Sequence, residues 1–160
     1  MKAANVKEIK DELKTRSPKE LLELCLRLSR FKKENKELLT YLLFESYDEL
    51  AFIESVKSYM DEQFAVVNRK SYYYIRKSIR KILTTTKKYI RYSQKKETEV
   101  DLLIYFCLKL KKFKPSINRS AALQNMYIRQ VDLIKKTLKQ LHEDLQFDYE
   151  EDMNELLNKN

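Results

Sequence analysis

The chain has 160 residues and a formal net charge of +9, and 43% of its residues are hydrophobic. This length and apolar content are enough for one domain with a substantial core, and they exclude a fully disordered polyanion-binding chain. No apolar run is long enough to cross a membrane, and residues 1–14 are too charged for a secretory signal. We therefore expect a single domain over residues 1–160, located in the cytoplasm.

Glycine is absent from the sequence, and Pro18 and Pro115 are the two prolines. Average usage of about 7% would give roughly eleven glycines in a chain of this length. Because primed hairpin turns, left-handed caps and close backbone approaches favour glycine, its absence argues against a β-rich fold. The sequence predicts an all-α protein, an irregular helical bundle or a set of stacked α-hairpins with about six to eight helices.

Two capping boxes predict the N-terminal helices. Asn5 and Glu8 have the spacing that opens a short helix, which we expect to end near Arg16. Residues 17–20 form a second box with proline at the first helical position, so a second helix should run to about Phe31.

The third predicted helix begins near Glu34 or Asn35. Its apolar side is formed by Leu39, Leu42, Leu43, Leu50, Ile53, Val56, Met60 and Phe64. Ser46 and Glu49 fit another capping box, so two helices bent at residues 45–47 are the alternative. We favour one long helix.

The fourth predicted helix carries the strongest charge signal in the sequence. Residues 63–96 contain eleven Lys or Arg side chains and no Asp or Glu. At about 100° per residue, cations and apolar side chains separate onto opposite faces, which predicts one amphipathic helix over about residues 69–93. The cationic arc contains Arg69, Lys70, Arg76, Lys77, Arg80, Lys81, Lys87, Lys88, Arg91 and Lys95. The apolar arc contains Tyr72, Ile75, Ile79, Ile82, Leu83, Thr86, Tyr89 and Ile90.

Three further helices are expected after the basic one. Thr98 is the expected cap of a helix that runs to about Phe113, where the second proline stops it. Asn118 or Ser120 then starts a long helix, and a short one is expected near residues 149–157.

Acidic residues gather in two other segments. Residues 143–160, the acidic C-terminal segment, hold seven acids and one lysine and have a net charge of −6. Residues 45–62 hold six acids and one lysine. Either segment could neutralise the basic helix, and the C-terminal one could compete with an external polyanion for it.

Residues 21–32 align without gaps on residues 103–114, at an offset of 82. This similarity suggests a two-fold internal repeat of helical units, and chance matching of leucine-rich helices is the alternative. Cys25 and Cys107 occupy equivalent positions in the two segments. Because neither has a neighbouring base that would stabilise a thiolate, we expect both to be buried small hydrophobes.

No arrangement of residues predicts catalysis. His142 is the single histidine, so no second imidazole is present to build a metal site with it. Without glycine there is no phosphate-cradling loop and no nucleophile elbow. We therefore expect no enzyme activity, no cofactor, no metal and no small-molecule substrate.

The leading functional hypothesis is a non-enzymatic module that binds nucleic acid through phosphates with little sequence specificity. The predicted contacts are Arg69, Arg76, Lys77, Arg80, Lys81, Lys87, Lys88 and Arg91. Neighbouring tyrosines, Tyr73 and Tyr74 among them, could stack on unpaired bases or simply line the core. The alternative is a protein-interaction or scaffold module whose basic face meets an acidic partner or the chain's own acidic C-terminal segment. Attachment to anionic lipid is a third and weaker hypothesis, because the apolar face of the basic helix is needed for the core.

Overall fold

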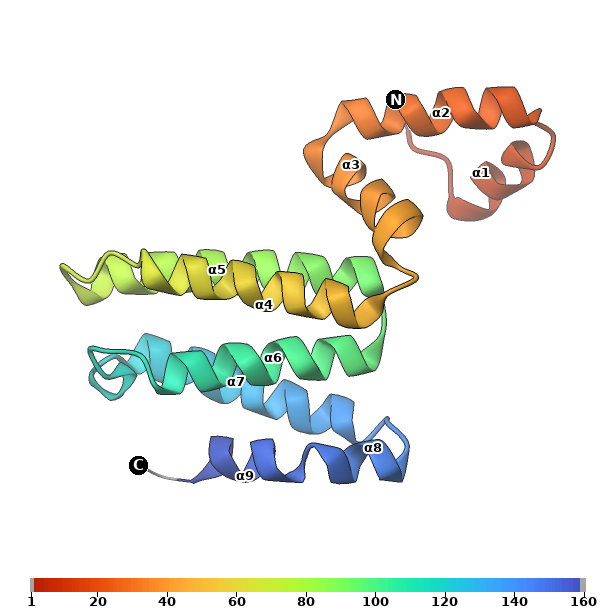
Figure 1. The fold of residues 1–160 in the computed structure, drawn as a ribbon. Helices are drawn as coiled ribbons and strands as arrows, with labels where there is room; N and C mark the ends of the chain where they lie inside the picture. Colours follow the sequence, from red (N-terminus) through yellow and green to blue (C-terminus); the bar gives the residue numbers. More distant parts are fainter. Residues whose placement is uncertain (1, 159–160) are drawn as a thin grey trace. The chain divides into compact units, whose positions relative to one another are not determined.

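The structure, a computed structural model, describes residues 2–158. Within this range the chain forms nine α-helices, a π-helical turn and a 3-10 turn, with no strand (Figure 1). The all-α prediction is therefore confirmed. No helix among the described residues is both long and apolar enough to cross a membrane.

The chain divides into two compact units, Met1–Phe44 and Glu45–Asn160. The expectation of a single domain over residues 1–160 stays a prediction, which an unfolding experiment can test.

The first unit contains three short helices, α1 (Val6–Leu13), α2 (Pro18–Phe31) and α3 (Lys33–Thr40). Both predicted capping boxes are present: the Asn5 side chain accepts from the Glu8 N–H at 2.9 Å, and Ser17 with Glu20 forms the second. The second helix has the predicted bounds, whereas α1 ends at Leu13 instead of near Arg16. None of residues 2–40 is buried.

The prediction of one long third helix is wrong, because the helix is interrupted before residue 49. The π-helical turn η1 (Tyr41–Glu45) follows α3, and α4 (Glu49–Ala65) begins after a turn at residues 46–48. The cap of α4 is Asp48, not Ser46: its carboxylate accepts from the Ala51 N–H at 3.0 Å. The alternative of two helices bent near residues 45–47 is thus confirmed.

The second unit is built around α6. It contains α5 (Tyr72–Ser93), α6 (Lys96–Lys111), the 3-10 turn η2 (Ile117–Arg119), α7 (Ala121–Leu138), α8 (Glu143–Asp148) and α9 (Glu150–Leu157). Helix α6 packs against α4, α5, α7 and α9. Its buried residues are Thr98, Val100, Leu102, Leu103, Ile104, Phe106, Cys107 and Leu110. Because it is covered on several sides, α6 is apolar around most of its circumference.

The predicted start of α6 is wrong, whereas its end lies close to the predicted one. The helix begins at Lys96, so Thr98 is not its cap; the Thr98 hydroxyl is buried and donates to Glu49 of α4. The helix ends at Lys111, two residues before the expected Phe113. Of the two start sites proposed for the next long helix, Ser120 is the one that precedes α7.

The two segments of the proposed internal repeat differ in burial. No residue of α2 is buried, whereas α6 has eight buried side chains. Cys25 is exposed, which contradicts the expectation that both cysteines are buried, while Cys107 is buried as expected. The two aligned helices therefore occupy different environments, and the two-fold internal repeat stays a prediction.

Candidate nucleic-acid interface

Helix α5 forms the basic surface, and its apolar arc was predicted correctly. Six members of that arc are buried: Ile75, Ile79, Ile82, Leu83, Thr86 and Ile90. The buried Thr86 hydroxyl donates to the Ile82 carbonyl at 3.0 Å, so it leaves no unpaired polar group in the core. The helix ends where Gln94 adopts a left-handed conformation, φ 58°, the position where glycine is otherwise favoured.

Burying the apolar arc turns the cations of α5 outward. Lys77, Arg80, Lys81 and Arg91 are exposed, and Arg76 is half-buried. Within residues 2–158, no carboxylate forms an ion pair with any of these five side chains. From Arg76 to Arg91 the row extends roughly 22 Å along the helix axis. We call these five residues the α5 cationic face.

The predicted start of the basic helix at residue 69 is three residues too early. Lys70 donates its N–H to the Asn68 side chain at 3.0 Å, and Ser71 is extended, so the helix begins at Tyr72. Arg69 therefore lies in the loop before α5, with its guanidinium 5.1 Å from the Phe113 ring centroid. Helical periodicity alone gave no signal for this turn.

Two other predicted contacts, Lys87 and Lys88, are half-buried. Burial lowers the pKa of the Lys87 ammonium, and the charge of Glu99 opposes that shift. The Lys88 ammonium lies 5.1 Å from the Tyr89 ring centroid. Both side chains are consequently less available to a ligand than the exposed Lys77, Arg80, Lys81 and Arg91.

The tyrosines of α5 separate into packed and exposed groups. Tyr89 and Tyr92 have ring centroids 6.0 Å apart, Tyr92 is buried, and the Tyr72 hydroxyl donates to the Ser116 carbonyl at 2.7 Å. Tyr73 and Tyr74 are 59% and 45% exposed and contact each other edge to face at 5.3 Å. These two are the more exposed tyrosines of α5, and the Arg76 guanidinium lies 5.9 Å from the Tyr73 ring centroid.

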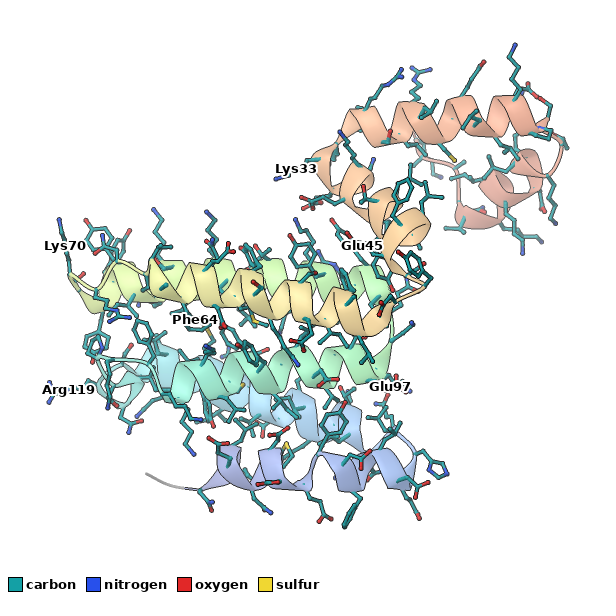
Figure 2. The ribbon with its side chains drawn as sticks, viewed as in Figure 1. Lys33, Glu45, Phe64, Lys70, Glu97 and Arg119 are labelled. Carbon is teal, nitrogen blue, oxygen red and sulfur yellow. The ribbon has the colours of Figure 1, made fainter. Side chains whose placement is uncertain are left out.

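A second group of cations lies beside the start of α5. The bond from Tyr72 to Ser116 joins this end of α5 to the connection between α6 and α7, and Figure 2 shows Lys70 and Arg119 at that end of the unit. The exposed cations there are Arg69, Lys70, Lys114 and Arg119. Lys114 and Arg119 belong to a second basic cluster that the sequence indicated as a possible extension of the basic surface, and the Tyr72–Ser116 bond places their loop beside α5.

Other basic residues near this connection are occupied within the chain. Lys109 pairs with Asp61 at 2.7 Å, and Lys112 pairs with Glu155 at 2.7 Å. The Lys111 ammonium donates to the Glu155 carbonyl and, at 2.7 Å, to the Asn158 carbonyl. These lysines hold neighbouring helices together.

The described part of the acidic C-terminal segment packs on α6. Helix α9 contacts α6, and the Tyr149 hydroxyl donates to the Asp101 carboxylate at 3.0 Å. Figure 1 shows α8 and α9 on the opposite side of α6 from α4 and α5. Residues 143–158 therefore do not cover the α5 cationic face; the remaining residues of the predicted segment, 159 and 160, lie outside the described chain.

Three acids of residues 45–62 form ion pairs with lysines that lie outside the α5 cationic face. Asp61 pairs with Lys109, and Glu54 pairs with Lys57 at 2.9 Å. Glu49 pairs at 2.9 Å with Lys95, which follows α5 and belongs to the predicted cationic arc. Intramolecular neutralisation is thus found just beyond the C-terminal end of α5.

The remaining candidates for chemistry are His142 and Cys107. His142 is exposed and its ring nitrogen accepts from the Asp144 N–H at 3.4 Å. Burial raises the pKa of the Cys107 thiol to about 12. In residues 2–158, no three His, Cys, Asp or Glu side chains are grouped as metal ligands would be. No protein family, no curated protein and no solved structure matches this chain.

Proposed function

We propose that this protein is a non-enzymatic helical module that binds nucleic acid through phosphates along the α5 cationic face, with little sequence specificity. The observation that carries the proposal is the row of Arg76, Lys77, Arg80, Lys81 and Arg91, in which no side chain has a carboxylate partner in the described chain. Like charges at i,i+4 destabilise a helix slightly, so an unmixed row is more consistent with an anionic ligand than with a solvated face.

The spacing of the row suits a phosphate backbone. A strand presents one phosphate about every 3.4 Å, so a row of roughly 22 Å can follow several of them. Tyr73 and Tyr74 add exposed rings at one end of the row, where unpaired bases could stack. A cytoplasmic location, expected from the sequence, would give access to nucleic acid.

The test measures binding of a labelled oligonucleotide by fluorescence anisotropy at several salt concentrations. We expect log K to fall with log[salt] at a slope of about −4, because each neutralised phosphate contributes close to −0.9. Changing Lys77, Arg80, Lys81 and Arg91 to Glu should abolish binding and remove most of that slope.

A matched control keeps net charge from explaining the result. Arg129, Lys135, Lys136 and Lys139 are exposed cations on or next to α7. Changing these four to Glu alters the net charge by the same amount but leaves α5 intact, so binding should fall by less than about tenfold. Equal losses in both variants, or no binding by the native chain at low salt, would remove the proposal.

An acidic protein is the other partner that this face could bind. That partner would be recovered from a lysate after nuclease treatment, and its recovery would depend on Lys77, Arg80, Lys81 and Arg91. Such a result without oligonucleotide binding would support the protein-interaction hypothesis instead.

A further inference from the structure

The first unit leaves many of its large apolar side chains exposed. No residue between 2 and 40 is buried, although α1 and α2 are both amphipathic. Eight large apolar side chains of these helices are 39–82% exposed: Val6, Ile9, Leu13, Leu22, Leu24, Leu26, Leu28 and Phe31. At about 100° per residue, Leu24, Leu28 and Phe31 share one side of α2, and Leu22 and Leu26 lie on the opposite side. With Val6, Ile9 and Leu13 of α1, the first three form an open apolar patch of the kind that soluble proteins rarely leave exposed, so it marks an interaction surface.

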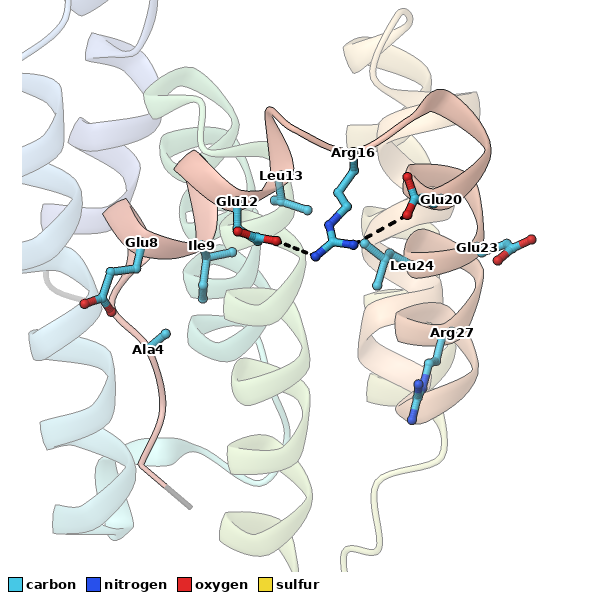
Figure 3. A pocket seen from close by; sticks show the side chains of 10 residues that line it. All are labelled: Ala4, Glu8, Ile9, Glu12, Leu13, Arg16, Glu20, Glu23, Leu24 and Arg27. Carbon is cyan, nitrogen blue, oxygen red and sulfur yellow. Dashed lines mark hydrogen bonds and ion pairs between the residues drawn. The ribbon is translucent and has the colours of Figure 1, made fainter.

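A groove between α1 and α2 forms part of this surface. Figure 3 shows Ile9 and Leu13 of α1 and Leu24 of α2 directed toward a cavity of about 600 Å³. Arg16 lies between the two helices and bonds both Glu12 and, at 3.5 Å, Glu20. The walls are therefore apolar, and their geometry is held by a charged bridge at the connecting turn.

The rim of the groove is acidic, although the chain as a whole is basic. Its charged residues are Glu8, Glu12, Glu20, Glu23, Arg16 and Arg27. Glu12 and Glu20 already hold Arg16, whereas no cation of the described chain pairs with Glu23. An occupant with an apolar stripe and a basic flank fits this rim best.

Helix α1 itself has those properties. At about 100° per residue, Val6, Ile9 and Leu13 form its apolar stripe. Lys7, Lys10 and Lys14 lie along one flank of the stripe, and Glu8 and Glu12 lie along the other. When two such helices pack in parallel about a two-fold axis, the basic flank of each faces the acidic flank of the other.

The available area is sufficient for a stable dimer. With roughly 200 Å² for each large side chain, of which slightly more than half is exposed, the six residues of this patch offer roughly 700 Å². A standard interface takes about the same area from each partner. Two helical hairpins that cover each other's apolar sides also form a four-helix arrangement, a common solution for amphipathic helices.

We propose that the hairpin of α1 and α2 is a self-association surface whose occupant is a second copy of this chain. The apolar side chains of the two hairpins pack together, and Lys7 and Lys10 of each copy face the acidic rim of the other. The proposal is independent of nucleic-acid binding. If both hold, dimerisation presents two α5 cationic faces to one polyanion and raises its avidity.

The first experiment is analytical ultracentrifugation of the full chain over a range of concentrations. We expect a dimer that dissociates on dilution and is lost in the Leu28→Glu/Phe31→Glu variant. Leu50→Glu/Ile128→Glu is the matched control, because Leu50 and Ile128 are similarly exposed but lie in the second unit; it should dimerise normally. The proposal would be overturned if the native chain stayed monomeric at roughly 100 μM, because its self-association would then be weaker than expected for an interface of this area.

A charge-swap experiment tests the predicted arrangement. The Lys7→Glu/Lys10→Glu and Glu23→Lys variants, which leave the Arg16 bridge intact, should each dimerise at least tenfold more weakly than the native chain, and their mixture should form a heterodimer. Circular dichroism checks that both retain their helices. If each variant dimerises as tightly as the native chain, the proposed pairing is wrong.

Cys25 provides an independent probe, because it is exposed among the leucines of α2, whereas Cys107 is buried with a raised pKa. Labelling of Cys25 by a thiol reagent should slow at least severalfold as the protein concentration rises through the dimerisation range. The Leu28→Glu/Phe31→Glu variant should be labelled at one rate throughout. A native rate that does not change with concentration would contradict a second copy as the occupant.

Discussion

Asp101 is a carboxylate whose environment opposes its charged form. Burial between α6 and the C-terminal helices raises the pKa of its carboxyl group, and the bond from Tyr149 and the charge of Lys57 act in the opposite direction. Since the raised pKa means that the folded state binds the proton more tightly than the unfolded state, the contribution of Asp101 to stability is greatest at low pH. It falls as pH rises from the ordinary aspartate value through the raised one.

Changing Asp101 to Asn should remove this pH-dependent loss of stability while keeping an acceptor for the Tyr149 hydroxyl. We expect the variant to be more stable than the native chain at pH 7, by less than about 1 kcal/mol because solvent partly screens the site. Below the ordinary pKa of aspartate the two should converge. Urea unfolding at both pH values measures this, with the exposed Asp132→Asn as control; lower stability of Asp101→Asn at pH 7 would contradict it.

At the scale of elements, α2 and α6 have similar sequences and different environments. Leu28 and Leu110 are equivalent in the alignment, yet Leu28 is 59% exposed and Leu110 is fully buried. A helix gains most of its stability in a protein from the surface that covers it, and α6 has four helices around it. Equivalent substitutions should therefore have different effects.

We expect Leu110→Ala to lower the free energy of unfolding by about 2–5 kcal/mol, because it leaves a cavity in the core. The equivalent Leu28→Ala should change it by less than about 1 kcal/mol. Urea denaturation followed by circular dichroism, at a concentration where the chain is monomeric, compares the two. Similar losses in both variants would indicate that α2 is buried in solution as α6 is.

At the scale of the whole molecule, nearly all of the core belongs to the second unit. Among the described residues, every buried side chain except Tyr41 follows residue 44. The helices of the first unit have 8, 14 and 8 residues, lengths that are marginal without a covering surface. The second unit should therefore fold without the first.

A chain of residues 45–160 should unfold cooperatively, with a midpoint within about 5 °C of the main transition of the full chain. Thermal circular dichroism at low protein concentration measures both. The full chain should show an additional gradual loss of helix from residues 2–40. Failure of the shorter chain to fold would instead support the single domain that the sequence predicted.

Part of the candidate interface was predictable because it depends on one helix. The apolar and cationic arcs of α5 follow from helical periodicity, so the exposure of Lys77, Arg80, Lys81 and Arg91 agrees with the expectation. The positions of Arg69 and Lys87 were not predictable in this way. The first depends on a turn around Asn68, and the second on how closely α6 packs beside it.

The sequence by itself determined the helical class, the N-terminal caps and the polarity of α5, since these follow from composition and from contacts within a few residues. Only the tertiary structure decided which leucine-rich helix is buried, where the acidic segment packs and which lysines have carboxylate partners. A periodic pattern shows which side of a helix is apolar. It does not show what covers that side, because the covering surface comes from residues far away in the chain.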